Sequence, residues 1–574
     1  MRAEGRQRRR RASGPLRAER PASRAARLST LARRAADAAV LERTEEIIKP
    51  DLDRRQYRSV VLSNGLQVLL ASDPEADAAA ASMSIKAGSF QDPSDFLGLA
   101  HFHEHMLFLG TEKFPEEDAY EKYLKDHGGY SNAYTADEMT NYYFRVNAPH
   151  LKGALDRFSQ FFIAPTFAES AVDREMRAVD SESTNYASDE GWRRLQVMKT
   201  TAEAQHPFHR FTVGNLDTLG YAGPDAVRKE LVRWNAAHYH GKAMKLAIAG
   251  KESLDELEAL AREFFEVVRA GPAAEPSDTA TERPLPWADQ QVGCYLEVVP
   301  KIEDRSVGIY WPLPPSQKHL YAKIETYLCH IIGHEGEGSL HALLNAMGWI
   351  EGLSAGCACS FSDAQLLSVE VSLTQEGERN IEQVLESIFA YIAVVREAGP
   401  RAETYEELRL LNTVGFRFRE ESPAPENFVA SATSSMQYYS ASDALRGPSA
   451  MDEWLPETVE SWMELLLPDR CFIIQASPDF DQSEEAGDAK WTKERWYGAT
   501  YRSRPLQSEQ LTRWASPSEA ARDGLNFPAD NPFVPRDFEL RSDKVVQPKT
   551  SLDVVPPTEL DCDASGLMKL WFKT

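Results

Sequence analysis

The sequence predicts an α+β fold built from two domains, each with an antiparallel sheet flanked by helices. The chain has 574 residues, which is too long for one hydrophobic core. Strand-like and helix-like segments interleave without the strict alternation of a parallel βαβ fold. A Pro-rich polar stretch at 276–290 interrupts this pattern, which restarts near residue 291. We therefore expect one domain on each side of that stretch.

Composition and turn residues divide the chain into six predicted segments. The boundaries follow shifts in charge and runs that are rich in Pro, Gly, Asp and Asn. In chain order the segments are a disordered basic start at 1–45, a first domain at 46–275, a linker at 276–290, a second domain at 291–515, a linker at 516–540 and a short remainder at 541–574.

The first domain contains the clearest local signals. Asn64 and Gly65 interrupt an apolar run, which predicts a β-hairpin. A helical run that begins at Gly98 ends at the C-cap residue Gly110. The other expected elements are a strand near 80–87, a helix at 115–127, one or two strands at 131–146, an amphipathic helix at 150–163 and a long charged helical region at 168–202.

Charge is distributed unevenly along the chain. The net charge is −24, although residues 1–34 hold twelve Arg and only two Glu. The remainder is therefore strongly acidic and repels phosphate backbones, so nucleic acid is not an expected partner. The Arg-, Ala- and Ser-rich start is typical of an organelle transit peptide, and a disordered basic tail explains it equally well. We expect a cytosolic protein, with a mitochondrion or another organelle as the alternative.

Two further features narrow the class of protein. Charged residues interrupt every apolar stretch, so no membrane span and no membrane partner are expected. The six Cys residues lack the spacing of a disulfide framework or of a zinc ribbon. This absence indicates reduced thiols in an intracellular protein.

One short motif carries the strongest chemical signal. His101, Glu104 and His105 form H-x-x-E-H, the inverted zinc motif of the inverzincins. Positions i and i+4 share one face of a helix, so both imidazoles can bind one metal ion. Glu104 edges the same face, where it can accept a proton from a zinc-bound water. Composition predicts about 0.02–0.03 chance copies of the motif, and a structural histidine pair is the alternative.

The third ligand has to come from another part of the chain. Zinc in a catalytic site takes three protein ligands and leaves one position open. Glu175 and Glu182 lie seven residues apart, which puts both carboxylates on one face of a helix. One of them can bind the metal while the other orients a ligand. By spacing alone, the acidic face of a solvated helix is the commoner explanation.

Eight segments of the chain carry a family resemblance. They are GLAHFHEHMLFLGT at 98–111, SNAYT at 131–135, TNYYF at 140–144, AVDSE at 178–182, GHEGEGSL at 333–340, NTVGFRF at 412–418, ERWYG at 494–498 and LWFK at 570–573. Together they resemble the pitrilysin/insulysin family of zinc metallopeptidases. The resemblance runs from about residue 46 to the end of the chain and is highly specific.

The resemblance implies a metallohydrolase fold of the LuxS/mitochondrial-processing-peptidase type with two homologous domains. Residues 46–275 would form the catalytic zinc-binding domain, and 291–515 a degenerate copy without the motif. Residues 541–574 would begin a third, incomplete domain. The chain thus corresponds to the N-terminal half of such a peptidase.

The resemblance also assigns roles to individual residues. A single Zn²⁺ per chain would be held by His101, His105 and Glu182. Glu104 would be the catalytic base and Glu175 a carboxylate behind the ligands. The family's edge strand, which pairs with the substrate backbone by β-augmentation, matches Asn132, Ala133 and Tyr134. Further implied contacts are Phe108 on the substrate side, and His334 with Gly336 in a surface of the second domain that binds a peptide end.

Two departures from the family pattern affect the expectations. Position 103 is His where the family typically has Cys. Two residues along a helix correspond to about 200° of rotation, so His103 should point away from the metal. The family's second half supplies an Arg and a Tyr that stabilise the oxyanion, and neither has a matching position here. We therefore expect full activity to need a C-terminal half, as a separate chain or an oligomer partner.

The predicted function is that of a zinc metalloendopeptidase. It would hydrolyse internal bonds of small peptides through a zinc-bound water that Glu104 activates. The alternative is a noncatalytic half-protein that contains zinc and binds peptides or acts as a scaffold. The complete set of base and ligands favours the enzyme, and the missing second half favours the alternative.

Overall fold

A computed structural model describes residues 40–536, apart from 273–282, 289, 423 and 484–488, together with two short strands near the C-terminus. The described residues up to Asp530 form one compact unit, and those from Asn531 onward form a second. The Arg-rich segment at 1–34 lies outside the described residues. Its predicted nature as a transit peptide or a tail stays a prediction.

The first sheet is mixed and ends in the edge strand β5. Its strand order is β1-β2-β3-β7-β4-β6-β5, and β3 and β7 form a parallel pair. The predicted hairpin is present in β2 and β3, with Gly65 at a φ of 85° in the turn. The strands are β1 (Val40–Thr44), β2 (Gln56–Leu62), β3 (Gln67–Ser72), β4 (Ala78–Ile85), β5 (Tyr130–Thr135), β6 (Thr140–Asn147) and β7 (Met244–Gly250).

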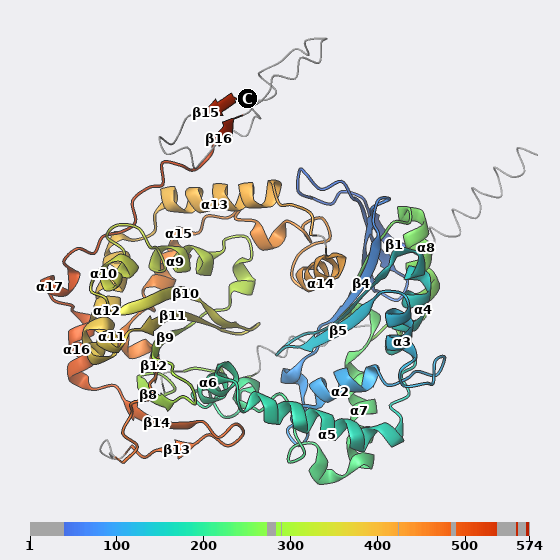
Figure 1. Ribbon diagram of the computed structural model, residues 1–574, viewed down its shortest axis with the longest axis horizontal. Coiled ribbons are helices and arrows are strands. Elements are labelled where there is room, and N and C mark those ends of the chain that lie inside the picture. The colour runs from blue at the N-terminus through green and yellow to red at the C-terminus, as the bar shows by residue number, and fades with distance from the viewer. Residues whose placement is uncertain are drawn as a thin grey trace, which may run out of the picture. The chain divides into compact units, whose positions relative to one another are not determined.

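The second sheet is also mixed and has β10 at one edge. Its strand order is β10-β11-β9-β12-β8-β14-β13, with β8 and β12 parallel. Figure 1 shows β9, β10 and β11 beside the helices that cover them. The strands are β8 (Cys294–Val299), β9 (Ser306–Leu313), β10 (Ile350–Ser360), β11 (Gln365–Leu373), β12 (Phe472–Ala476), β13 (Thr492–Lys493) and β14 (Thr500–Pro505).

Six strands in each sheet follow one plan. The order β2-β3-β7-β4-β6-β5 corresponds to β14-β8-β12-β9-β11-β10, with the same relative direction at every pairing. The chain reaches them differently, because β2 precedes β3 whereas β14 follows β12. The predicted α+β class is therefore confirmed. The parallel pair in each sheet was not predicted, since it needs a strand that returns after several helices.

The helices that precede the predicted linker at 276–290 match most of the sequence expectations. The predicted helical region at 168–202 is divided into α5 and α6, because Asp189 caps α6 by accepting a hydrogen bond from the N–H of Trp192. The helices are α2 (Leu99–Leu107), α3 (Ala119–Asp126), α4 (Leu151–Ile163), α5 (Glu169–Tyr186), α6 (Glu190–Lys199), α7 (Pro224–His238) and α8 (Leu254–Phe265).

The second half of this chain contributes further helices, one of which packs against the first sheet rather than the second. Gly333 ends α9, in agreement with the glycine-rich sequence that follows it. The helices are α9 (Ile324–Ile332), α10 (Leu340–Ala346), α11 (Gln375–Arg379), α12 (Ile381–Ala398), α13 (Ala402–Arg417), α14 (Pro425–Ser435), α15 (Pro456–Met463), α16 (Ser508–Ala515) and α17 (Glu519–Arg522).

The first sheet is covered on both faces. Side chains alternate along its strands, so Val68 and Leu70 lie in one apolar cluster and Leu69 and Ala71 in another. The first cluster includes residues of α2, α4, α5, α7 and α8. The second cluster includes buried residues of α14, such as Val429. The second half of the chain thus supplies a helix to the core of the first.

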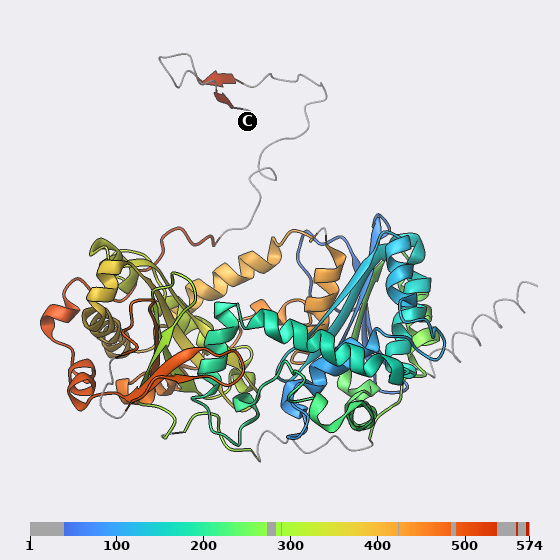
Figure 2. The same ribbon diagram turned by 60° about the horizontal axis from the view of Figure 1, so that its bottom comes forward.

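Polar contacts fix α14 against the first sheet. The Ser84 hydroxyl donates to the carbonyl oxygen of Thr433 at 2.8 Å, and the Thr433 hydroxyl lies 2.8 Å from that of Ser82. Asn141 donates to the same Thr433 hydroxyl at 3.1 Å. Both views show α14 beside the strands of the first sheet (Figures 1 and 2). Because these groups are buried, each contact also satisfies a polar atom that water cannot reach.

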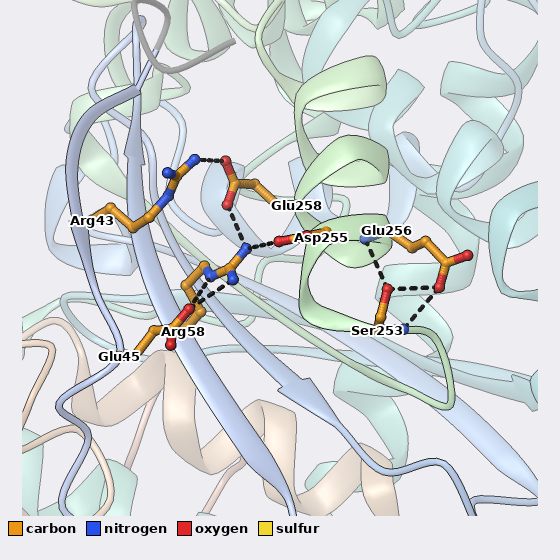
Figure 3. A network of polar contacts seen from close by, with 7 residues as sticks. All are labelled: Arg43, Glu45, Arg58, Ser253, Asp255, Glu256 and Glu258. Atoms are coloured by element: carbon orange, nitrogen blue, oxygen red, sulfur yellow. Dashed lines mark hydrogen bonds and ion pairs between the residues drawn. The ribbon is translucent and has the colours of Figure 1, made fainter. Parts of the chain in front are cut away.

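Strand β1 lies within the segment 1–45, which was expected to be disordered, and an ion pair links it to α8. β1 pairs with β2, and its Arg43 contacts Glu258 of α8. Arg58 of β2 donates to Asp255 at 2.8 Å and to Glu45 at 2.6 Å (Figure 3). Ion pairs between two strands and a helix thus stabilise a segment whose polar composition alone favours disorder.

The second unit contains a short antiparallel pair, β15 (Thr558–Leu560) with β16 (Leu570–Phe572). It falls within the segment predicted to begin a third domain. Among the described residues, no helix has both the length and the apolar character needed to cross a bilayer.

Candidate metal and active site

The start of helix α2 is fixed by close backbone contacts. Gly98 precedes the helix with a φ of 87°, and a Cβ there would lie 2.2 Å from the Cα of Gly214. Only glycine fits both the conformation and the approach. The Asp92 carboxylate accepts hydrogen bonds from the N–H groups of Gly98 at 2.7 Å and Ala100 at 2.8 Å. These contacts set the direction of the side chains that follow along α2.

His101 and His105 present one nitrogen each to the same space. Nδ1 of His101 lies 2.7 Å from the carbonyl oxygen of Val213, and Nδ1 of His105 lies 2.9 Å from Oε1 of Glu175. Both partners are hydrogen-bond acceptors, so each Nδ1 donates a proton to its partner. In the neutral imidazoles each Nε2 therefore keeps a lone pair. Fixed tautomers of this kind are typical of metal-ligating histidines.

Helix α5 brings a carboxylate to these two nitrogens. Oε2 of Glu182 lies 3.6 Å from Nε2 of His101 and 3.3 Å from Nε2 of His105. Ligand atoms at about 2.0–2.1 Å from a tetrahedral zinc lie about 3.3–3.4 Å from one another. The position of α5 follows from its buried stripe, which is formed by Ala171, Val172, Met176, Val179 and Ser183.

The three residues form a group that fits a zinc ion. Their ligand atoms lie within 4.8 Å of one another, and in the described part of the chain no other group of three or more such residues is as compact. Two imidazole nitrogens and one carboxylate oxygen are a donor set that zinc prefers. All three residues are partly exposed, which leaves room for a further ligand.

The electrostatics of the group favour a cation. Burial lowers the pKa of His105, but hydrogen bonds with Glu175 and Glu182 outweigh it and raise this pKa to about 9. The same contact with His105 is the main cause that lowers the pKa of Glu182 to about 2. Burial and the neighbouring His105 lower the pKa of His101. The pocket therefore holds a charged carboxylate and attracts positive charge, whether a proton or a metal ion.

Glu104 lies on the same helix in a more enclosed position. Its side chain is buried, and burial raises the pKa of its carboxyl to about 7. Oε2 of Glu104 accepts a hydrogen bond of 2.6 Å from the hydroxyl of Thr135, at the end of β5. A carboxyl with a pKa near neutrality can both accept and return a proton. The structure thus puts a group suited to general base chemistry beside the histidine pair.

Strand β5 adds an open edge next to Glu104. It is the last strand of its sheet, and β6 is its one neighbour in the described sheet. Asn132 and Tyr134 are exposed on one face, whereas Ala133 and Thr135 are half-buried on the face toward α2. An edge strand of this kind can accept an additional extended strand. The predicted substrate-side residues Asn132, Ala133 and Tyr134 therefore lie on one accessible edge.

Two other predicted positions lie outside the metal group. Phe108 caps the end of α2, and its half-buried ring packs on that of Phe161 at 5.1 Å. His334 and Gly336 lie in the turn between α9 and α10, where Nδ1 of His334 accepts a hydrogen bond from the N–H of Gly336. This turn lies between two helices that pack on β10 of the second sheet, and among the described residues no contact joins it to the metal group.

His103 points away from the metal group, as its position on the helix predicts. The ring is fully buried among Phe167, Trp234 and Tyr239, with ring centroids 4.4–5.4 Å away. Nε2 of His103 lies 2.9 Å from the amide nitrogen of Asn235. His103 therefore contributes to packing rather than to the metal group.

The sequence did not single out several residues that the structure places at the site. Val213 and Thr135 hold His101 and Glu104 through contacts between distant segments, which local spacing does not reveal. Tyr186 donates a hydrogen bond to Glu182 at 2.5 Å. Its spacing of four residues on one helix was a signal that could have identified it.

Three protein-family models match successive parts of the chain. The model described as Insulinase (Peptidase family M16) matches residues 67–208, which include the whole metal group. The Peptidase M16 inactive domain matches residues 225–411. The middle or third domain of the same peptidase family matches residues 416–574.

Curated proteins and solved structures of high similarity agree with these matches. The peroxisomal insulin-degrading enzyme-like 1 of Arabidopsis thaliana is 38% identical over 86% of this chain and 50% of its own length. The insulin-degrading enzyme of Homo sapiens is 34% identical over 92% of this chain and 50% of its own length. The crystal structure of pitrilysin matches with a TM-score of 0.80 and 28% identity, over 87% of this chain and 52% of that chain. The chain thus spans about half the length of these relatives.

Proposed function

The chain belongs to the insulinase family, peptidase family M16, and we propose from this premise that it is a zinc metalloendopeptidase of the insulysin type. The observation that carries the proposal is the group formed by His101, His105 and Glu182. Two imidazoles with outward hydrogen bonds turn their free nitrogens toward one carboxylate oxygen. A histidine pair with a purely structural role would not need a carboxylate oxygen so close to both Nε2 atoms.

In this proposal each residue has a separate task. His101, His105 and Glu182 would hold one zinc ion, and Glu175 would orient His105 through their hydrogen bond of 2.9 Å. A bound zinc ion would act as a Lewis acid and lower the pKa of a water in its open position to about 7. Glu104 would accept the proton of the attacking water, because its pKa of about 7 suits proton transfer at neutral pH.

Strand β5 would orient the substrate. An extended peptide that pairs with this edge would lie alongside Asn132 to Tyr134, and the strand ends at Thr135, whose hydroxyl contacts Glu104. Pairing with the backbone is independent of the side chains of the peptide, so it favours broad specificity. Extended segments of small peptides are therefore the proposed substrates, with internal bonds as the sites of cleavage.

The second half of the chain would have a supporting role. The turn with His334 and Gly336 is the proposed surface for one end of a peptide, with the adjacent strand β10. The relatives described above carry about as much chain again. We infer that full activity needs additional chain like that of these relatives, either in the same polypeptide or in a partner.

A cleavage assay with two matched variants tests the proposal. The zinc-loaded chain is incubated with an internally quenched fluorescent peptide, beside Glu104→Gln and beside Glu112→Gln as a control. Glu112 is an exposed residue shortly after the same helix. We expect Glu104→Gln to lower the cleavage rate by about 10²–10⁴-fold with zinc retained, and Glu112→Gln to leave it unchanged.

The same assay separates the enzyme from its rival, a noncatalytic zinc-containing scaffold. Equal, near-zero cleavage by all three proteins with zinc retained would favour the scaffold. A wild-type chain that binds no zinc would contradict both functions.

A further inference from the structure

Tyr186 contacts the proposed metal group at a point that the proposed function does not use. Its hydroxyl donates a hydrogen bond of 2.5 Å to Oε1 of Glu182, one helical turn earlier on α5. Oε2, the other oxygen of the same carboxylate, faces the Nε2 atoms of His101 and His105. The two oxygens of Glu182 therefore have different partners.

We propose that Tyr186 is a positioning residue, which occupies one oxygen of Glu182 and leaves only the other for the metal ion. The inference rests on the proposed function, because it concerns the same site. A carboxylate can bind a metal through one oxygen or through both. With a metal ion bound, a hydroxyl hydrogen bond to Oε1 would favour coordination through Oε2 alone.

The ring of Tyr186 is held in place independently of Glu182. It stacks on Trp192 of α6, with centroids 4.4 Å apart and planes at 26°. It also packs against a cluster whose buried members are Phe211, Val213 and Tyr497. A ring fixed by this aromatic packing loses little additional side-chain entropy when its hydroxyl bonds to Glu182. The position of the hydroxyl is thus set by packing and not by the carboxylate alone.

The aromatic cluster also connects the second half of the chain to the metal group. Tyr497 belongs to the segment between β13 and β14, and its carbonyl oxygen accepts a hydrogen bond of 2.8 Å from Arg193. Val213, in the same cluster, accepts the hydrogen bond of His101. One packed cluster therefore supports a contact to His101 and a contact to Glu182.

The variant Tyr186→Phe tests this proposal, because it keeps the ring and removes only the hydroxyl. We expect zinc affinity, measured by competition with a chromophoric chelator, to fall by about 10-fold or more. We also expect the visible absorption bands of the Co²⁺-substituted variant to weaken and shift, since Glu182 can then bind through both oxygens. The Co²⁺ spectrum reports on ligand geometry and does not respond to a merely structural role.

The control is Tyr321→Phe, which removes a similar hydroxyl contact to a carboxylate, at 2.9 Å from Asp443 in the second half. It should leave zinc affinity and the Co²⁺ spectrum unchanged. Wild-type values of both in Tyr186→Phe would overturn the proposal for Tyr186 and leave the proposed function intact. A wild-type chain without zinc affinity would instead overturn the proposed function.

Discussion

Helices α2 and α9 occupy the same place in two sheets of the same strand order, yet only one of them carries a metal group. Each follows the corresponding strand, β4 or β9, and each begins after a residue with a left-handed backbone, Gly98 or Lys323. Counted from these residues, the matching positions are His101 and Thr326, His103 and Leu328, Glu104 and Cys329, and His105 and His330.

The position of the proposed third ligand differs in the same way. Burial and the neighbouring His334 lower the pKa of His330, and the charge of Glu407 on α13 only partly offsets this, whereas the hydrogen bond with Glu175 on α5 helps to raise the pKa of His105. Seven residues further on, α5 has Glu182 and α13 has Val414. The second sheet thus has a histidine and a nearby glutamate at the matching helices and lacks the other residues of the proposed zinc site. The fold is shared, and the chemistry depends on a few side chains placed on it.

The largest effect is expected when a residue of α2 is replaced by the residue type at the matching position of α9. His101→Thr copies the residue at the matching position and removes one of the three proposed ligands. We expect zinc affinity to fall by about 10³-fold, because each ligand contributes a substantial share of the binding free energy. Competition with a chelator measures this change. His330→Thr is the control in α9. A similar fall in the zinc affinity of this variant would contradict the different roles of the two helices.

Removal of the carboxylate behind the ligands should have an intermediate effect. Glu175→Gln keeps the shape of the side chain but weakens its hold on His105. Substitutions of such partners typically cost about 10–100-fold in metal affinity. The matched change in α13 is Glu407→Gln, for which we expect unchanged zinc affinity by the same titration. An equal response of both variants would contradict the different roles of the two glutamates.

His103 of α2 and Leu328 at the matching position of α9 are both buried, but only the histidine can titrate. We therefore expect His103 to make the free energy of unfolding depend on pH. Burial lowers the pKa of His103 to about 3, so it stays neutral in the folded chain while an unfolded histidine titrates near 6.5. The unfolded state then binds more protons between these values, so the free energy of unfolding falls as the pH falls below about 6.5. From pH 7 to pH 5 the loss is about 2 kcal/mol.

His103→Leu tests this, because leucine already occupies the matching position in α9. Urea unfolding at pH 7 and pH 5 should show a smaller loss of stability in the variant than in the wild type. The same pH dependence in both proteins would mean that His103 is not the group responsible.

The smallest effect concerns the residue before each helix. Lys323 has a φ of 48°, a conformation that costs a side-chain-bearing residue about 1–2 kcal/mol. Glycine avoids this cost but loses about 0.5–1 kcal/mol in unfolded-state entropy. We expect Lys323→Gly to raise the free energy of unfolding by about 0.5 kcal/mol, as measured in urea. A clear loss of stability would indicate that the contact of Lys323 with Tyr439 outweighs the strain.

Much of this arrangement could be predicted from local sequence. The spacing of His101 and His105 on one helical face, and of Glu175 and Glu182 on another, is a local property. The turn at Gly65 and the helix boundaries near Gly98 and Gly333 follow from glycine chemistry. The division of the chain into domains and the roles of individual site residues stay predictions.

Features that depend on distant segments could not be predicted. The carbonyl of Val213 reaches His101 only because Gly98 and Gly214 approach closely. Strand β14 is the last strand of the second sheet along the chain, and no local pattern indicates its partner β8. Strand β1 was expected to be disordered because local sequence does not reveal its contact with α8, in which Arg43 pairs with Glu258, 215 positions away.

The central claim is that α2 and α5 together form one zinc site, and anomalous scattering tests it most directly. Crystals of the zinc-loaded chain are measured on both sides of the zinc absorption edge. We predict one anomalous peak per chain, within bonding distance of His101, His105 and Glu182. A peak beside His330 and His334 instead, or no peak among the three residues, would contradict the account.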